Sequence, residues 1–366
     1  MVIHIALLFF VLILALFNYA RHVDFNKKNE LFLSLTFICI FLIQGLRSKN
    51  VGWDTSKYYD AYYYISIVPV FGFRWEPLFV LLNRFALMIS DSPQTIFILS
   101  SALINYFTAK FIYDNSKDDI SCFWMVFLYI TLMPYFNSMN QIRAYLAISI
   151  GVHSYSILKT SQRKIDYLRA LLVIGVAVGF HRTALILLSI PFVMAMPRVQ
   201  LKDILFVCAL FGVFVIAFDP IVSLALRAFP VYNKYLNSTY MEGMSASGYH
   251  LSVSFIKLLL FVLYFLENGR CKSRDHQSLS HEAVFCLFSI LLSILRFKIS
   301  FAVRMGYYFD LLCFLFLAKS PLKTSKRNAR IIYSVLLLFG IVSFFYIIYS
   351  PNGSRGTADY TFFWSM

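Results

Sequence analysis

Four arginines lie at the ends of apolar segments of this chain, where lipid would have to bury their charge. Burying a cation in a membrane costs on the order of a few kcal/mol unless it has a partner. Because acidic residues are scarce near these positions, a bound anion is an economical partner, and the planar guanidinium donates paired hydrogen bonds to phosphate. The alternative is that each arginine reaches lipid headgroups. The predicted pyrophosphate-binding residues are Arg143, Arg182, Arg296 and Arg304.

A histidine and two carboxylates are the predicted catalytic groups: His181, Asp54 and Glu76. A neutral imidazole, with an ordinary pKa of about 6.5, can accept a proton from a sugar hydroxyl. His181 directly precedes Arg182, which favours this interpretation over a histidine that satisfies a helix end. Asp54 has a structural alternative as the cap of a helix beginning near Thr55. The base stays open among these three residues, Glu242 and His250.

Aromatic and amide side chains near the same segments predict a sugar-binding surface. Aromatic rings provide apolar faces for sugars, although they are also common at membrane interfaces. The amides belong to Phe136–Ala147 (FNSMNQIRAYLA), a polar interruption that lipid would not tolerate without partners. The predicted sugar-binding residues are Trp53, Tyr58, Tyr62, Trp75, Asn140 and Gln141.

The sequence contains no motif that predicts a metal or another cofactor. It has no paired DxD acids and no HExxH, and its six cysteines lack zinc or disulfide spacing. We therefore expect chemistry that is independent of metal, with arginines stabilising negative charge.

The elements that position these residues are predicted to be membrane helices. Of the 366 residues, 60% are hydrophobic and 14% are charged, which is typical of a polytopic membrane protein. We expect one all-α integral membrane domain over residues 1–366, with about 12 transmembrane helices. The apolar runs are 2–20, 31–46, 94–113, 121–136, 142–158, 165–180, 182–196, 201–219, 251–266, 281–295, 300–318 and 331–349. Residues 77–90 predict a further helix that is re-entrant or interfacial, because it is too short to cross.

Positive charge predicts the orientation of these helices. Lys and Arg outnumber Asp and Glu by 33 to 18, and much of the excess lies in short alternate loops, which indicates membrane orientation rather than nucleic-acid binding. If 77–90 does not cross, the basic loops all face the cytoplasm. These loops are 21–30, 159–164, 197–202, 267–275 and 319–330. The loops 47–76 and 220–250 then lie outside, on the same face as the candidate site residues.

The ordered segments GWDTSKYY, RWEPLFVLLNRF, NQIRAYLAISI, FHRTALILL and RMGYYFDLL resemble the EpsG-like family of exopolysaccharide proteins, which is grouped with Wzy-type O-antigen and capsule polymerases. The resemblance covers roughly residues 30–320. It implies a multi-span body like that of GT-C glycosyltransferases, in a bacterial inner membrane with its active site facing the periplasm. The implied substrates are oligosaccharide repeat units on undecaprenyl pyrophosphate, as donor and acceptor, and a chain-length regulator is an expected protein partner beside the membrane lipids.

Three other functions stay open at this stage. A glycan ligase or another lipid-linked glycosyltransferase would differ from a polymerase mainly in its acceptor. A flippase for the same lipid-linked sugar would need polar residues through the membrane, whereas the unusual residues here gather at one face. A membrane acyltransferase using His181 would need a partner that the sequence does not make evident.

Overall fold

The computed structural model describes residues 1–20, 25–71, 74–116, 118–161, 163–196, 199–218, 220, 223, 227, 248–270, 280–350 and 354–365. Within these residues the secondary structure is helical, apart from one isolated antiparallel bridge between Arg47 and Phe362. An all-α architecture is thus confirmed. The chain forms two compact units, Met1–Phe192 with Tyr333–Met366, and Val193–Ile332.

The first unit carries the N-terminal helices and most of the last long helix. Its elements are α1 Val2–Ala20, α2 Phe25–Gly45, α3 Thr55–Asp60, α4 Tyr62–Ile67, α5 Pro77–Ile89, α6 Gln94–Asn115, α7 Asp119–Thr131, α8 Pro134–Asn140, α9 Ile142–Gly151, α10 His153–Thr160, α11 Lys164–Phe180, the 3-10 helix η1 Arg182–Leu188, α12 Ser189–Met194 at its boundary, α18 Lys326–Tyr349 from Tyr333 onward, and η5 Phe363–Ser365. The second unit contains α13 Leu201–Ile216, α15 Gly248–Arg270, α16 His281–Leu295, α17 Phe301–Lys319 and η4 Ser320–Lys323.

Several helices are long and apolar enough to cross a membrane. Four of those described meet this criterion, namely Val2–Ala20, Gln94–Asn115, Phe301–Leu322 and Lys326–Tyr349, and a fifth is formed if the bent pair α7 and α8 counts as one span. The chain is a membrane protein by this measure, but the expected number of about 12 spans is not confirmed. One reason is that some apolar runs are broken: 142–158 forms α9 and α10, and 182–196 forms η1 and α12.

The break between α7 and α8 has a local cause. Pro134 is the first residue of α8, and Met133 before it adopts a φ of 80°, so the chain turns by 51° between the two helices. Proline cannot continue a helix from the preceding turn, because it lacks the N–H and its ring clashes with the backbone. A second break at Gln141 separates α8 from α9, so the polar interruption found in the sequence coincides with a helix end.

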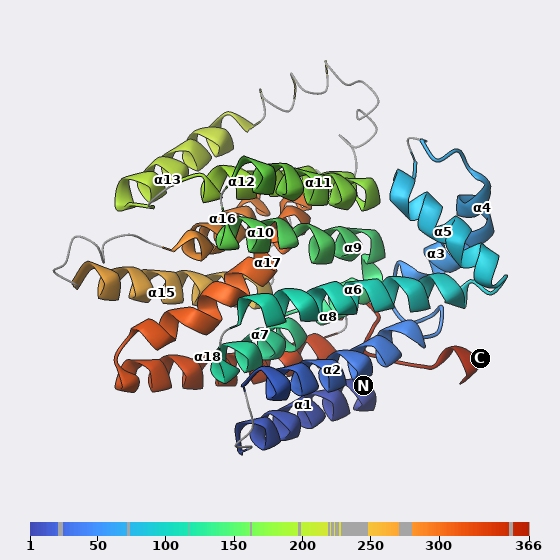
Figure 1. Ribbon diagram of the computed structural model, residues 1–366, viewed down its shortest axis with the longest axis horizontal. Helices are drawn as coiled ribbons and strands as arrows, with labels where there is room; N and C mark the ends of the chain where they lie inside the picture. The colour runs from blue at the N-terminus through green and yellow to red at the C-terminus, as the bar shows by residue number, and fades with distance from the viewer. Residues whose placement is uncertain are drawn as a thin grey trace. The chain divides into compact units, whose positions relative to one another are not determined.

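Helix pairs build the interior of each unit. In the first unit α2 packs along α6 and α9 packs along α11, and in the second α16 packs along α17 (Figure 1). The segments α7, α8 and α9 are almost wholly buried, whereas α1 and α18 expose many large apolar side chains. Exposed apolar faces on long helices are expected where lipid is the solvent.

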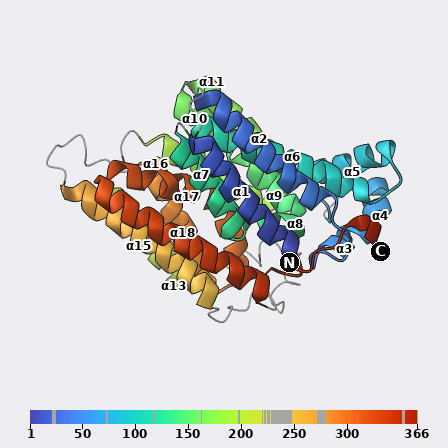
Figure 2. The ribbon, with the colours of Figure 1, turned by 90° about the horizontal axis from the view of Figure 1, so that it is seen from below.

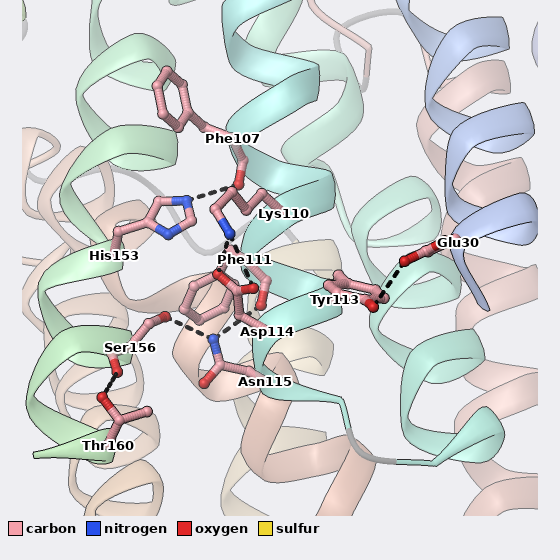
Figure 3. A network of polar contacts seen from close by, with 10 residues as sticks. All are labelled: Glu30, Phe107, Lys110, Phe111, Tyr113, Asp114, Asn115, His153, Ser156 and Thr160. Atoms are coloured by element: carbon pink, nitrogen blue, oxygen red, sulfur yellow. Dashed lines mark hydrogen bonds and ion pairs between the residues drawn. The ribbon is translucent and has the colours of Figure 1, made fainter. Parts of the chain in front are cut away.

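A polar network ties α2, α6 and α10 together near the C-terminal ends of α6 and α10 (Figure 3). Tyr113 of α6 donates to Glu30 at 2.9 Å, and Asn115 donates to Ser156 of α10 at 2.8 Å. Lys159 in turn donates to the side-chain oxygen of Asn115 at 3.2 Å. The network borders the loop 159–164, one of those predicted to be cytoplasmic.

Some sequence expectations fall on residues outside the described ranges. They comprise most of the predicted outer loop 220–250, including Glu242, and parts of the predicted cytoplasmic loops at 21–24, 162, 197–198 and 271–275. His250 is described only as part of the helical backbone of α15.

Candidate active site

Glu76 holds Arg143 and His181 together within the first unit. One carboxylate oxygen, Oε2, accepts from Arg143 Nη1 at 2.5 Å, and the other, Oε1, bonds with His181 Nδ1 at 2.9 Å. The Glu76 side chain is 7% exposed, while those of Arg143 and His181 are 23% and 26% exposed. A buried carboxylate therefore connects two cation-forming groups that remain partly accessible.

Each of the three side chains comes from the end of a helix. Glu76 is the extended residue before Pro77, which starts α5, and a residue before proline is biased toward this conformation. Arg143 lies in the first turn of α9, just beyond the break at Gln141. His181 is extended between α11 and η1. The breaks in the apolar helices thus place polar side chains together.

An aromatic group surrounds the Arg143 guanidinium. Its Cζ lies 4.8 Å from the ring centroid of Trp75, 5.9 Å from Tyr58 and 6.0 Å from Phe79. The Nε of Arg143 also donates to the Tyr58 hydroxyl at 3.4 Å. Ring faces attract a cation and fix its orientation, so the guanidinium is held from one side by the rings and from the other by Glu76.

The neighbours of Glu76 determine whether its carboxyl group carries a proton. Burial raises the pKa of this carboxyl, but the hydrogen bond from His181 and the charge of Arg143 outweigh burial and hold the pKa at about 2. The carboxylate is therefore ionised at neutral pH and accepts a hydrogen bond from the N–H at Nδ1 of His181. When the ring is neutral and its proton is on Nδ1, the Nε2 atom carries a lone pair. This is the arrangement by which a carboxylate orients a histidine base.

Comparison with protein families matches residues 30–362 to the EpsG family, which is nearly the whole chain. The chain belongs to the EpsG family. The expected resemblance is thus confirmed, and it makes the chain an exopolysaccharide-related membrane protein. Comparison with curated proteins and with solved structures gave no match.

The three predicted catalytic residues of this EpsG-family chain do not all contact one another. Glu76 and His181 are hydrogen-bonded to each other, whereas Asp54 forms an ion pair with Lys57 at 2.7 Å. Asp54 does occupy the N-cap position of α3, which begins at Thr55, but its side chain makes no capping hydrogen bond. Of the two predicted acids, Glu76 therefore contacts the histidine, whereas Asp54 pairs with a lysine.

The predicted sugar-binding residues also divide into groups. Tyr58 and Trp75 contact Arg143, but Tyr62 is fully buried and donates its hydroxyl to the Ser90 carbonyl at 3.0 Å. Trp53 is 55% exposed.

The amides of the polar interruption are buried beside the break. Asn140 is 1% and Gln141 7% exposed, and Asn137 of the same segment is 1% exposed. Arg143 instead donates hydrogen bonds to Tyr58 and Glu76.

The four predicted pyrophosphate-binding arginines lie in both units. Arg143 and Arg182 belong to the first unit, where Arg182 starts η1 next to His181. Arg296 follows α16 and Arg304 lies in α17, both in the second unit, and Arg296 is only 2% exposed. The predicted partner of Arg143 was an external anion, and within the protein Arg143 forms an ion pair with Glu76.

Sequence reasoning did not identify a buried ion pair in the second unit. Lys257 of α15 donates to Asp310 of α17 at 2.9 Å and to Ser289 of α16 at 2.9 Å, and Ser289 donates to Asp310 at 3.1 Å. A signal was present, because each charge interrupts an apolar run, and charges inside membrane helices are rare unless paired or functional.

Arg47 is another buried charge that the sequence did not single out. It is 1% exposed, donates to the carbonyls of Gln44 and Met139, and stacks over Phe97 at 4.6 Å. Carbonyls at the C-terminal ends of helices favour a cation, so Arg47 joins the ends of α2 and α8.

Proposed function

We propose that this protein polymerises oligosaccharide repeat units carried on undecaprenyl pyrophosphate, at the periplasmic face of a bacterial inner membrane. The observation that carries the proposal is the carboxylate of Glu76, bonded at once to His181 and Arg143, in a chain of an exopolysaccharide family. A histidine base and an arginine for phosphate are the two groups that such a glycosyl transfer requires.

In the proposed reaction the acceptor is a sugar hydroxyl of one lipid-linked unit. Its oxygen bonds to the anomeric carbon of the donor glycan, and the bond from that carbon to the phosphate oxygen breaks. The electron pair leaves with undecaprenyl pyrophosphate, and the hydroxyl proton passes to Nε2 of His181. Glu76 orients the ring and stabilises the imidazolium that forms.

Arg143 would neutralise the leaving pyrophosphate. Its side chain is 23% exposed and keeps donors beyond the two used by Glu76 and Tyr58, because a guanidinium has five N–H groups. Arg182 follows the base in the chain and is the second arginine of the first unit proposed for this role. Arg296 and Arg304 belong to the second unit and stay predicted phosphate-binding residues of that unit. Tyr58 and Trp75 would offer ring faces to the sugars.

The test replaces the two central residues in the full chain and examines surface glycan on a gel. We expect Arg143→Ala and His181→Ala to abolish the polymer ladder while protein levels and the single lipid-linked repeat unit are retained. Removing a general base costs about 10²–10⁴-fold in rate. Arg143→Lys should also be defective, because an ammonium cannot make the paired contact of a guanidinium.

Matched controls lie elsewhere in the same unit. Arg163→Ala removes an arginine with a 71% exposed side chain, and His153→Asn removes a histidine bonded to the Phe107 carbonyl near the network of Figure 3. Both should keep the ladder. A normal ladder in Arg143→Ala and His181→Ala would refute the site, and loss of all surface glycan on deleting the protein would indicate a ligase or flippase instead.

A further inference from the structure

The segment 354–365, here called the tail, pairs with residues 46–53 of the first outer loop. Both lie in the first unit, and Figure 2 shows the tail as the dark red segment that ends at the label C. The backbone hydrogen bonds run from Ser48 N to Thr361 O at 2.9 Å, Gly52 N to Gly356 O at 2.9 Å, Trp53 N to Arg355 O at 3.1 Å and Phe363 N to Leu46 O at 3.0 Å. Each step forward along the loop meets a step backward along the tail, so the pairing is antiparallel.

Side chains reinforce the same register. The hydroxyls of Ser48 and Thr361 are 2.7 Å apart, and the Tyr360 hydroxyl donates to the Ile43 carbonyl at 2.8 Å. The His4 ring is 2.8 Å from the Thr357 carbonyl, and His4 is fully buried. The tail is therefore anchored along its length by α1, α2 and the loop that follows α2.

Two glycines allow this close approach. Gly52 has a φ of 97°, and a Cβ there would lie 2.8 Å from Asn140 Oδ1. Gly356 has a φ of 79°, and its Cβ would lie 2.8 Å from Cδ1 of the Trp53 ring. Other residues are strained at such angles, so both positions require glycine.

The paired loop leads directly into the candidate active site. Thr55 donates its hydroxyl to the Val51 carbonyl at 2.6 Å and begins α3. One turn later Tyr58 accepts from Arg143, which in turn bonds with Glu76. α3 has only six residues, and its N-terminal end is the end of the paired loop, while Ala61 alone separates its other end from α4. A helix this short does not hold its own position, so the loop helps to fix Tyr58 from the N-terminal side.

We propose that the tail is a positioning element of the active site: by pairing with residues 46–53 it sets α3, and thereby the aromatic side of the Arg143 site. This inference rests on the proposed function for its effect on rate. The pairing itself has a readout that does not need activity, namely hydrogen exchange of the loop amides.

The first experiment compares Gly356→Ala with Gly175→Ala in the purified full chain. Gly175 lies in α11, where nothing is within 4 Å of an added Cβ, so it is a matched glycine control. In Gly356→Ala we expect faster exchange over residues 46–58 and polymerisation at saturating substrate slowed by about tenfold, since small displacements of catalytic groups have large effects on rate. Gly175→Ala should match the parent protein in both. Unchanged exchange, or changed exchange with an unchanged rate, would overturn the proposal.

A rescue experiment separates positioning from general instability. Ser48→Cys and Thr361→Cys are added to Gly356→Ala, and the thiols are oxidised to a disulfide with copper phenanthroline, which takes up the two electrons. The cross-link should restore the polymerisation rate, and reduction of the disulfide should lower the rate again. The melting temperature of the protein should be the same in both states. A cross-linked protein that stays slow would show that the tail does not position the site.

The proposed function can fail independently of the tail. If Arg143→Ala polymerises normally, the pyrophosphate site is wrong, but faster exchange of 46–58 in Gly356→Ala still reports the pairing. If Arg143→Ala is inactive and Gly356→Ala is normal in exchange and rate, the proposed function stands and the positioning role is refuted.

Discussion

At the scale of single residues, the central feature is that one carboxylate serves two neighbours. Glu76 lies 67 residues from Arg143 and 105 residues from His181 in the sequence, yet it bonds with both. The charge of Arg143 is consequently already paired before any anion binds. A pyrophosphate would meet a guanidinium already oriented by Glu76 and by the ring of Trp75, which reduces the cost of ordering it on binding.

Exchanging the two candidate acids tests this arrangement. Glu76→Gln keeps the size of the side chain but cannot hold the imidazolium, so we expect polymerisation to fall by about 10²–10⁴-fold. Asp54→Asn should change the rate by less than about threefold, because Asp54 pairs with an exposed lysine. Rates measured on lipid-linked repeat units in detergent would decide between them. Equal losses in both variants would contradict the assignment of Glu76.

The low pKa of Glu76 predicts a dependence of stability on pH. The folded pKa is about 2, below the ordinary 4.5, so the carboxylate stabilises the fold above about pH 4.5 and this contribution is lost as the pH falls toward 2. The melting temperature of the protein should exceed that of Glu76→Gln at pH 7. This difference should shrink between pH 4.5 and 2. A difference that persists unchanged at pH 2 would exclude the ionised carboxylate as its cause.

At the scale of elements, buried polar contacts decide which helices meet. In the second unit α15 contacts both α16 and α17 through Lys257, Ser289 and Asp310. Such a pair is not strongly stabilising by itself, because both charges had to be desolvated, but it penalises any packing that separates them. The contact therefore specifies the arrangement of α15 against the helix pair.

A double-mutant cycle tests this role. Lys257→Met alone leaves Asp310 buried without its cation, and we expect a loss of about 3–5 kcal/mol. The double variant Lys257→Met/Asp310→Leu should be less destabilised than Lys257→Met, because no uncompensated charge remains. Thermal unfolding in detergent measures both. A double variant whose loss of stability equals the sum of the losses in Lys257→Met and in Asp310→Leu would rule out the coupling.

At the scale of the whole molecule, the predicted orientation in the membrane depends on whether α5 crosses the bilayer. A helix of 13 residues is about 20 Å long, which is shorter than the roughly 30 Å of a bilayer core. Its beginning at Pro77 agrees with the sequence expectation. If it does not cross, the loop before it and the site residues share the outer face.

Thiol labelling tests this topology. Reporter cysteines belong at exposed side chains, such as Lys57, which is 73% exposed, and Arg163, which is 71% exposed. We expect Lys57→Cys to react in intact cells with a reagent that cannot cross the membrane, and Arg163→Cys to react only after permeabilisation. The parent protein gives the background from its own cysteines. The reverse pattern would contradict the orientation.

Much of the fold and part of the site could be predicted because they depend on local physics. Apolar runs of helical length gave α1 from residue 2 to residue 20, as expected, and a proline fixed the start of α5. Arginine, histidine and glutamate residues beside apolar runs could be identified as candidate site residues, because burying polar groups in lipid costs free energy. The number of spans could not be obtained in this way, since composition does not show that 142–158 is broken into α9 and α10.

The sequence alone determined the helical membrane class, the EpsG family and the candidate residues for the proposed glycosyl transfer. Only the tertiary structure decided that Glu76 joins Arg143 to His181, and that the tail returns to the first outer loop. The physical reason is that burial and helix formation act on neighbours in the chain. The meeting of helix ends more than 60 residues apart depends instead on how all the helices pack.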